Sequence, residues 1–275
     1  MELPKGGIIG KTAAHFRQIQ KMNIPGHAAN AGYFIMVSIF PALVLLLSIL
    51  RYTDLDAEDL MYFLEGVIPQ ALLPTAERLI INTYAQTSQA VVSISAVGTL
   101  WSASRGMYGV LKGLNAIYDA QEDRGYWYTR GISVVYTFGL VIVLLLTLIL
   151  NVFGESLLGM LAQSTAPAWR LLSKVVNLRF FLLLILQTGL FTAMFMVLPN
   201  RKNSFSDSFP GAILASLGWL IFTELFSVYV NYFRSYANIY GSVYAVALSM
   251  LWLYFCLLIL FYGGVFNRLL IRSDP

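Results

Sequence analysis

The most constraining feature of this chain is a series of apolar stretches, each about as long as a helix that crosses a lipid bilayer. Two of them read VIVLLLTLIL (141–150) and FFLLLIL (180–186) and contain no charged residue. A spanning helix needs roughly 20 residues to cross about 30 Å of hydrocarbon. Inside lipid, an unbroken helix satisfies its own backbone hydrogen bonds. The pattern therefore predicts an all-α membrane protein.

The composition agrees with a lipid environment. Charged residues make up 12% of the 275 residues and hydrophobic residues 58%, with a mean hydropathy of +0.69. A soluble domain has about a quarter of its residues charged. The net charge of +4 is typical of a protein whose cations gather on one side of a membrane. We therefore expect membrane lipids as partners and no nucleic acid. The single cysteine, Cys256, excludes an intrachain disulfide.

Six spans are predicted within one membrane domain, residues 1–275. They cover about 29–50, 90–118, 131–153, 178–198, 209–233 and 242–266. The first contains Pro41, which predicts a helix kink, and the hydroxyl of Ser38 is placed to satisfy a carbonyl that the kink frees. The second is the least apolar because serines and two cations interrupt it. A turn, Asn238–Ser242, is predicted before the last span; it either offers backbone polar groups to a substrate or is only the start of the helix.

Lysine and arginine counts predict the orientation. If the second span crosses, the segments on the side of the amino terminus hold more of these cations than the opposite segments. We therefore expect both termini in the cytoplasm. No removable signal peptide is expected, because the first 30 residues are polar and basic and the first apolar stretch is full length.

Two further helices are expected outside the spans. Ala13, Phe16 and Ile19 share a face opposite Lys11 and Arg17, as in a helix that lies on an anionic membrane surface. In the outer loop 51–89, the segment TDLDAEDLMYFLEGV carries apolar residues at helical spacing. Its alternating acids have the spacing of a calcium-binding loop, but the sixth position is not glycine. Helix capping is therefore the better explanation of these acids.

Ionisable groups at bilayer depth are functional candidates by default. Arg105 in the second span and Glu224 in the fifth each lie in a polar stripe. The stripes contain Ser95, Gly98, Ser102, Arg105, Gly109, Lys112 and Gly113, and Ser216, Thr223, Glu224, Ser227 and Asn231, respectively. One interpretation is a hydrated cleft in which Arg105 binds an anionic group and Glu224 is its counter-ion or proton carrier. The other is a structural ion pair that only neutralises two buried charges.

Several other residues complete the candidate site. Ser102, Asn115 and Asn231 are candidates for the polar lining of a pathway, and Tyr240 lies in the predicted turn. Lys112 either lines the same pathway or reaches lipid phosphates at the interface. The GxxxG spacing of Gly109 and Gly113 lets another backbone approach, so a homo-oligomer also stays among the expected partners.

The residue inventory excludes most catalytic centres. The two histidines, His15 and His27, both precede the first span, so a histidine-rich metal centre is not expected. No P-loop, GxGxxG or GxSxG motif is present, so we expect no nucleotide or other cofactor and no serine hydrolase site.

Short motifs in a fixed order resemble the YihY/BrkB family of bacterial inner-membrane proteins, whose members were once labelled ribonuclease BN. They are SIFP (38–41), WSASR (101–105), LN (114–115), Tyr118, LPNR (198–201), FPGA (209–212), YGS (240–242), LWLY (251–254) and GG (263–264). The resemblance implies a six-helix bundle in the bacterial cytoplasmic membrane, with an arginine at the position of Arg105. The family's biochemical role is not settled, and transport or lipid translocation is the usual suggestion.

Three hypotheses for function follow. The first is a transporter or translocator for an anionic or amphiphilic substrate, such as a lipid, in which Arg105 contacts the anion. The second is a scaffold that recruits envelope proteins through the outer loop. The third is a lipid-active enzyme; a ribonuclease is not expected, because the densest acid cluster, Asp54–Asp59, lies in the outer loop.

Overall fold

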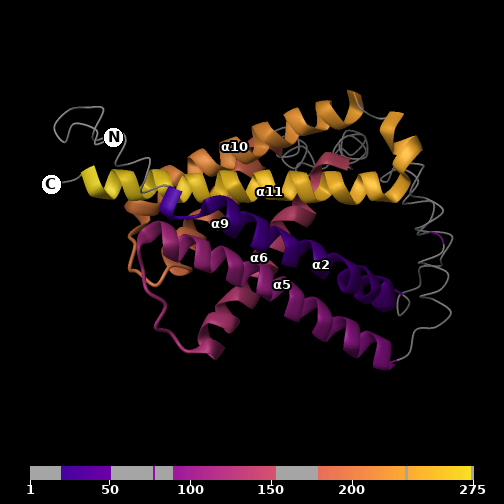
Figure 1. Cartoon of the computed structure of the whole chain (residues 1–275), viewed down its shortest axis with the longest axis horizontal. Coiled ribbons are helices and arrows are strands. Elements are labelled where there is room, and N and C mark those ends of the chain that lie inside the picture. Colours follow the sequence, from indigo (N-terminus) through magenta and orange to yellow (C-terminus); the bar gives the residue numbers. More distant parts are fainter. Residues whose placement is uncertain (1–19, 51–76, 78–88, 153–178, 233–234, 274–275) are drawn as a thin grey trace, which may run out of the picture.

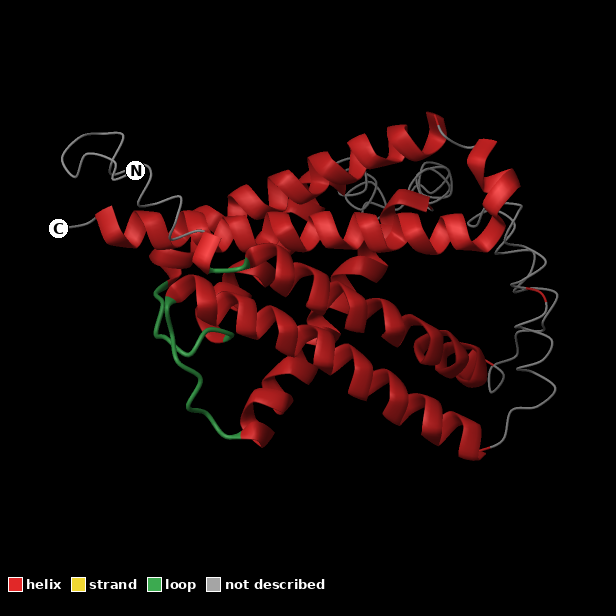
Figure 2. Ribbon diagram, in the orientation of Figure 1, coloured by secondary structure: helices red, strands yellow, loops and turns green. Residues whose placement is uncertain are grey.

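The computed structural model describes residues 20–50, 77, 89–152, 179–232 and 235–273. These residues form six helices: α2 (Ile24–Leu50), α5 (Gln89–Tyr118), α6 (Tyr126–Val152), α9 (Arg179–Val197), α10 (Phe205–Tyr232) and α11 (Ser235–Ser273) (Figure 1). No strand occurs in the described part of the chain (Figure 2). The all-α prediction is confirmed. The two helices expected near residues 13–19 and 56–67 lie outside the described residues.

Each predicted span falls on one of these helices. Three described stretches are long and apolar enough to cross a membrane: Phe180–Val197, Phe205–Val230 and Val246–Ile271. By length and composition these three helices can cross a membrane, and the expected six crossings stay a prediction.

Two local expectations are wrong. The segment Asn238–Ser242 is not a turn, because α11 is a continuous helix from Ser235 to Ser273. A lone glycine weakens a helix by only about 1 kcal/mol, and long apolar flanks outweigh that cost. In α2, the Ser38 hydroxyl donates to the Ile35 carbonyl at 2.6 Å, whereas the carbonyl that Pro41 frees is that of Val37.

Small residues let α5 lie directly on α2. A side chain added at Gly106 would meet Ile35 and the Ala31 carbonyl, and one added at Gly109 would meet the Ala31 backbone at 3.1 Å. Such close approach of backbones is typical of helix pairs in membranes. The glycine face of α5 is therefore its packing surface against α2.

The crossing of α10 and α11 is equally tight. A Cβ at Gly263 would lie 2.6 Å from the Gly211 carbonyl oxygen and 2.8 Å from the Ala215 methyl group. Asn267, one turn further along α11, accepts a hydrogen bond from the Gly211 amide at 2.6 Å and donates to the Ser208 carbonyl at 2.9 Å. Backbone contact and side-chain bonds thus fix this pair at one end.

The helices meet closely at one end of the molecule and diverge at the other. The loops 119–125 and 198–204 lie together at the end where α11 finishes, and the α2–α5 pair runs away from α11 toward the opposite end (Figure 2). Burial follows this arrangement: Phe261 of α11 is fully buried, whereas Val243 is 70% exposed. The apolar core therefore lies toward the end that carries these two loops.

Candidate functional site

Arg105 lies midway along α5 with an exposed side chain. Its guanidinium lies over the ring of Phe34 on α2, 5.1 Å from the ring centroid. Such a contact is favourable and becomes stronger where water is excluded. It occupies a face of the guanidinium and leaves the in-plane N–H groups free for a phosphate or carboxylate.

The same surface carries two more cation–aromatic contacts. The Lys112 ammonium lies 4.8 Å from the centroid of the Tyr108 ring, and the Arg130 guanidinium, from α6, lies 4.5 Å from that of Trp101. Arg130 also donates to the Trp101 carbonyl at 2.8 Å. We define the cationic face of α5 as Trp101, Arg105, Tyr108 and Lys112.

The spacing of these four residues explains why they form a single surface. Steps of four, three and four residues return to nearly the same side of a helix. The cationic face lies beside the glycine face that packs on α2, and both of its cations are exposed. It thus offers alternating aromatic and positive groups along one side of α5.

The structure does not bring Arg105 and Glu224 together. Glu224 is exposed on α10, which packs chiefly on α9 and α11, whereas α5 packs chiefly on α2. No ion pair joins these two side chains. The polar stripes of the second and fifth spans therefore do not form a shared Arg105–Glu224 pair.

The remaining predicted site residues are distributed over several environments. Ser102 is half-buried on α5 and Asn115 is buried near its end. Pro41 lies within α2, where its Cβ faces the position of Gly98. Asn231 and Tyr240 lie in α10 and α11, but their side chains lie outside the described part of the structure.

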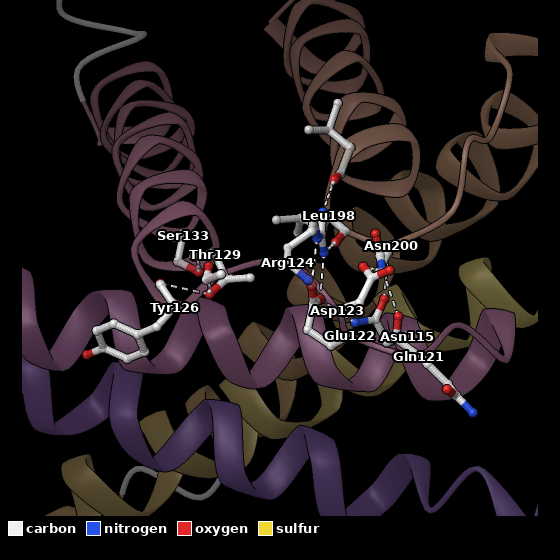
Figure 3. A network of polar contacts seen from close by, with 12 residues as sticks. Asn115, Gln121, Glu122, Asp123, Arg124, Tyr126, Thr129, Ser133, Leu198 and Asn200 are labelled. Atoms are coloured by element: carbon white, nitrogen blue, oxygen red, sulfur yellow. Dashed lines mark hydrogen bonds and ion pairs between the residues drawn. The ribbon is translucent and has the colours of Figure 1, made fainter.

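A polar network that we did not predict joins the loops 119–125 and 198–204 (Figure 3). The Asn115 amide donates to Glu122 at 2.7 Å, and its oxygen accepts from the Asn200 backbone amide, also at 2.7 Å. Asn200 in turn donates to the Gln121 carbonyl at 2.6 Å and to the Asp123 carboxylate. Asn115 therefore ties the end of α5 to the α9–α10 connection.

Arg124 completes this network. Its guanidinium donates to both Glu122 oxygens at 2.7 Å and to the Leu198 carbonyl at 2.7 Å. The Arg124 cation holds the pKa of the Glu122 carboxyl below its ordinary value. Donation to the carbonyls at the end of α9 is also favoured by the negative end of the helix dipole.

Arginine plays the same part at the end of α5. Arg268 of α11 donates to the Ile117 carbonyl and lies 3.5 Å from the Asp119 carboxylate. At the start of α10, Ser204 and Asp207 bond reciprocally through side chain and backbone, at 3.1 and 3.2 Å. This capping box could have been read from the sequence Ser-Phe-Ser-Asp before an apolar run. The contacts of Arg124 and Arg268 have no such local signal.

The described residues contain no group of three or more histidine, cysteine, aspartate or glutamate side chains that could hold a metal ion.

Six helices, three of them long and apolar enough to cross a membrane, define the described part of the chain as an all-helical membrane protein. The chain belongs to the family described as virulence factor BrkB, whose model matches residues 15–274. The family resemblance drawn from the short motifs is confirmed.

Relatives are similar over most of the chain. YfkH of Bacillus subtilis (strain 168), named a ribonuclease-like protein, is 32% identical over 244 residues, which is 88% of each chain. A UPF0761 membrane protein of Alteromonas mediterranea is 26% identical over 91% of this chain and 84% of its own. Another, of Vibrio vulnificus (strain YJ016), is 27% identical over 90% and 78%, respectively. No solved structure matches the chain.

Proposed function

We propose that this protein translocates an anionic amphiphile, foremost an anionic phospholipid, across the bacterial cytoplasmic membrane. The headgroup moves along the cationic face of α5, and the acyl chains stay in the surrounding lipid. The observation that carries the proposal is the exposed stripe in which Arg105 and Lys112 lie on aromatic rings.

The energetics of Arg105 support an anionic partner. An arginine at the centre of a spanning helix costs about 2.5–3.5 kcal/mol on insertion scales, and more in simulations. The ring of Phe34 offsets only part of this cost, because a cation–π contact contributes about 0.5–2 kcal/mol. A lipid phosphate would supply charge-assisted hydrogen bonds, which the guanidinium does not make within the described part of the chain.

The aromatic residues of the stripe suit the same task. Trp101 is 54% exposed, and its ring faces both the surface and Arg130. Tryptophan and tyrosine have an apolar ring and a polar tip, so they stay favourable beside both acyl chains and headgroups. A headgroup that leaves one cation would therefore reach the next across an aromatic residue.

The arrangement of the helices gives this surface a fixed base. The polar network of Asn115, Glu122 and Arg124 fixes one end of α5, while the α2–α5 pair diverges from α11 at the other end (Figures 1 and 3). The proposal needs no contribution from Glu224, which lies on α10. The family name and the relatives named as membrane proteins agree with a membrane role but name no substrate.

The test measures lipid movement in liposomes that contain the purified protein. Fluorescent phosphatidylglycerol and phosphatidylcholine of equal chain length are placed in both leaflets, and dithionite bleaches the outer leaflet. We expect the protein to speed phosphatidylglycerol movement more than phosphatidylcholine movement. Arg105→Gln should slow it about tenfold or more, since a hydrogen bond to a charged group contributes about 1.5–3 kcal/mol.

Matched variants make the result specific. Arg105→Lys keeps the charge but loses the planar fork, so it should retain intermediate activity. Lys21→Gln removes an exposed cation outside the cationic face and should behave as wild type. Lipid movement no faster than in empty liposomes, or equal rates for Arg105→Gln and wild type, would overturn the proposal.

A further inference from the structure

An apolar groove runs between α9 and α10, away from the cationic face of α5. It has a volume of about 530 Å³ and is lined from α9 by Leu184, Ile185, Thr188, Gly189, Thr192, Ala193 and Met196, and from α10 by Phe205, Phe209 and Ile213. Pockets of about 300–1,000 Å³ are the usual size for small-ligand sites. Both bordering helices are among those long and apolar enough to span a membrane.

The groove is open along its length. Ile185 is 69% exposed and Phe205 is 57% exposed, and the stacked rings of Phe205 and Phe209, 5.0 Å apart, form one wall. A Cβ added at Gly189 would meet no atom within 4 Å, so the space beside this glycine is empty. The lining runs along α9 from Leu184 to Met196, about 18 Å at 1.5 Å per residue. This is close to the depth of one leaflet, half of about 30 Å.

The groove ends beside a positive segment. Met196 and Phe205, which line one end, flank the loop that carries Arg201 and Lys202, both exposed. Two acids lie beside the loop: Asp207 accepts a hydrogen bond from the Ser204 amide, and Asp123 accepts one from the Asn200 side chain. The loop 198–204 itself contains two cations and no acid, so it places positive charge at the end of an apolar groove. The predicted orientation places this loop on the side where anionic lipids attract basic residues.

We infer that the groove holds one acyl chain of an anionic phospholipid, whose phosphate is bound by Arg201 and Lys202. The site is separate from the proposed translocation surface, and it binds a lipid that stays associated with α9 and α10. Two features select this occupant: a wall of apolar side chains as deep as one leaflet, and a pair of cations at its polar end.

The position of Thr188 favours a lipid chain over a polar ligand at this depth of the groove. Its hydroxyl is buried and has no hydrogen-bond partner among the described residues, while the Thr192 hydroxyl donates to the Thr188 carbonyl at 2.7 Å. Nine residues separate Thr188 from the end of α9, about 14 Å along the axis. A headgroup held by Arg201 does not reach that depth, so the site faces methylene groups there. Removal of this hydroxyl should leave lipid binding unchanged or stronger.

The test is native mass spectrometry of the delipidated, purified protein with added phosphatidylglycerol or phosphatidylcholine of equal chains. We expect about tenfold stronger retention of phosphatidylglycerol, and Arg201→Gln with Lys202→Gln should lower it to the phosphatidylcholine level. Gly189→Leu fills the groove and should reduce retention of both lipids. Gly131→Leu is the matched control, because a Cβ there also meets no atom within 4 Å and the residue lies on α6.

Three outcomes would overturn the inference: equal retention of the two lipids by wild type, wild-type retention by Gly189→Leu, or loss of retention in Thr188→Val. Melting temperatures and gel filtration of each variant identify any that fails to fold, and Gly189→Ala then serves as the smaller plug. Arg105→Gln should retain lipid at this site even if it no longer translocates lipid. Failure of the groove and failure of the proposed function are therefore separate results.

Discussion

Two arginines act as helix caps supplied from distant parts of the chain. Arg124 donates to the Val197 and Leu198 carbonyls at 3.3 and 2.7 Å, and Arg268 donates to the Ile117 carbonyl. The last carbonyls of a helix have no partner within it, and a cation there interacts favourably with the helix dipole. Each contact therefore satisfies a helix end and connects two helices. Loss of either arginine would affect the geometry of the whole loop-bearing end.

The Glu122–Arg124 pair gives the stability of the protein a pH dependence. The arginine and the Asn115 amide both stabilise the ionised carboxyl, so the pKa of Glu122 is below its ordinary value of 4.5. This stabilisation is fully present above pH 4.5 and is lost as the pH falls through the lower pKa of the folded state. Glu122→Gln should therefore lower the free energy of unfolding by about 1 kcal/mol at pH 7, since the pair is partly exposed.

The measurement compares melting temperatures of wild type and Glu122→Gln in the same detergent from pH 7 to pH 3. The difference should shrink as the pH falls below 4.5. A difference that stays constant over this range would show that the carboxylate charge makes no contribution. Asp119→Asn is a useful comparison, because the Asp119 side chain is 86% exposed and lies 3.5 Å from its arginine.

Among the helices, the crossing of α10 and α11 depends on the absence of side chains. Gly263→Ala would place a methyl group 2.6 Å from the Gly211 carbonyl oxygen, which forces the two helices apart. Overpacking of this kind costs about 1–3 kcal/mol. Melting temperature should fall accordingly, while Gly189→Ala, which meets no atom, should match wild type or exceed it. Equal stability of Gly263→Ala and wild type would contradict the close crossing.

The helices could be predicted from the sequence because the length of each apolar run indicates how far its helix extends. Their neighbours could not be predicted in the same way. The periodicity placed Arg105 and Gly109 on one face of α5, yet it could not say that α2, rather than α10, covers that face. Asn238–Ser242 shows the opposite failure, in which residues common in turns lie within a longer helix.

The candidate site, too, could be predicted from the sequence only in part. The cationic face was partly visible, since Arg105 and Lys112 stand out in an apolar span, but Trp101 and Tyr108 gained a role only from their contacts. The Asn115–Asn200 contact joins residues 85 positions apart. A single sequence contains no local pattern for such a pairing, so the polar network came from the structure alone.

For the whole molecule, the contacts predict which helix ends share a side of the membrane. His27 near the start of α2 lies against Gly113 of α5, and Asn115 bonds to Asn200 in the α9–α10 connection. The start of α2, the end of α5 and the start of α10 thus belong to one end of the bundle (Figure 1). Ala90, at the start of α5, lies at the opposite end of the bundle.

Cysteine labelling tests this arrangement together with the expected orientation. The single native cysteine, Cys256, is buried, so wild type should react little with a membrane-impermeant maleimide. Lys21→Cys and Lys202→Cys should react from the same side, and Ala90→Cys from the opposite side, because each of the three native side chains is exposed. With the amino terminus inside, the first two react in inverted vesicles and the third in intact cells. Reaction of Lys202→Cys and Ala90→Cys from one side would mean that α5 does not cross, and the proposed headgroup route along it would lose its physical basis.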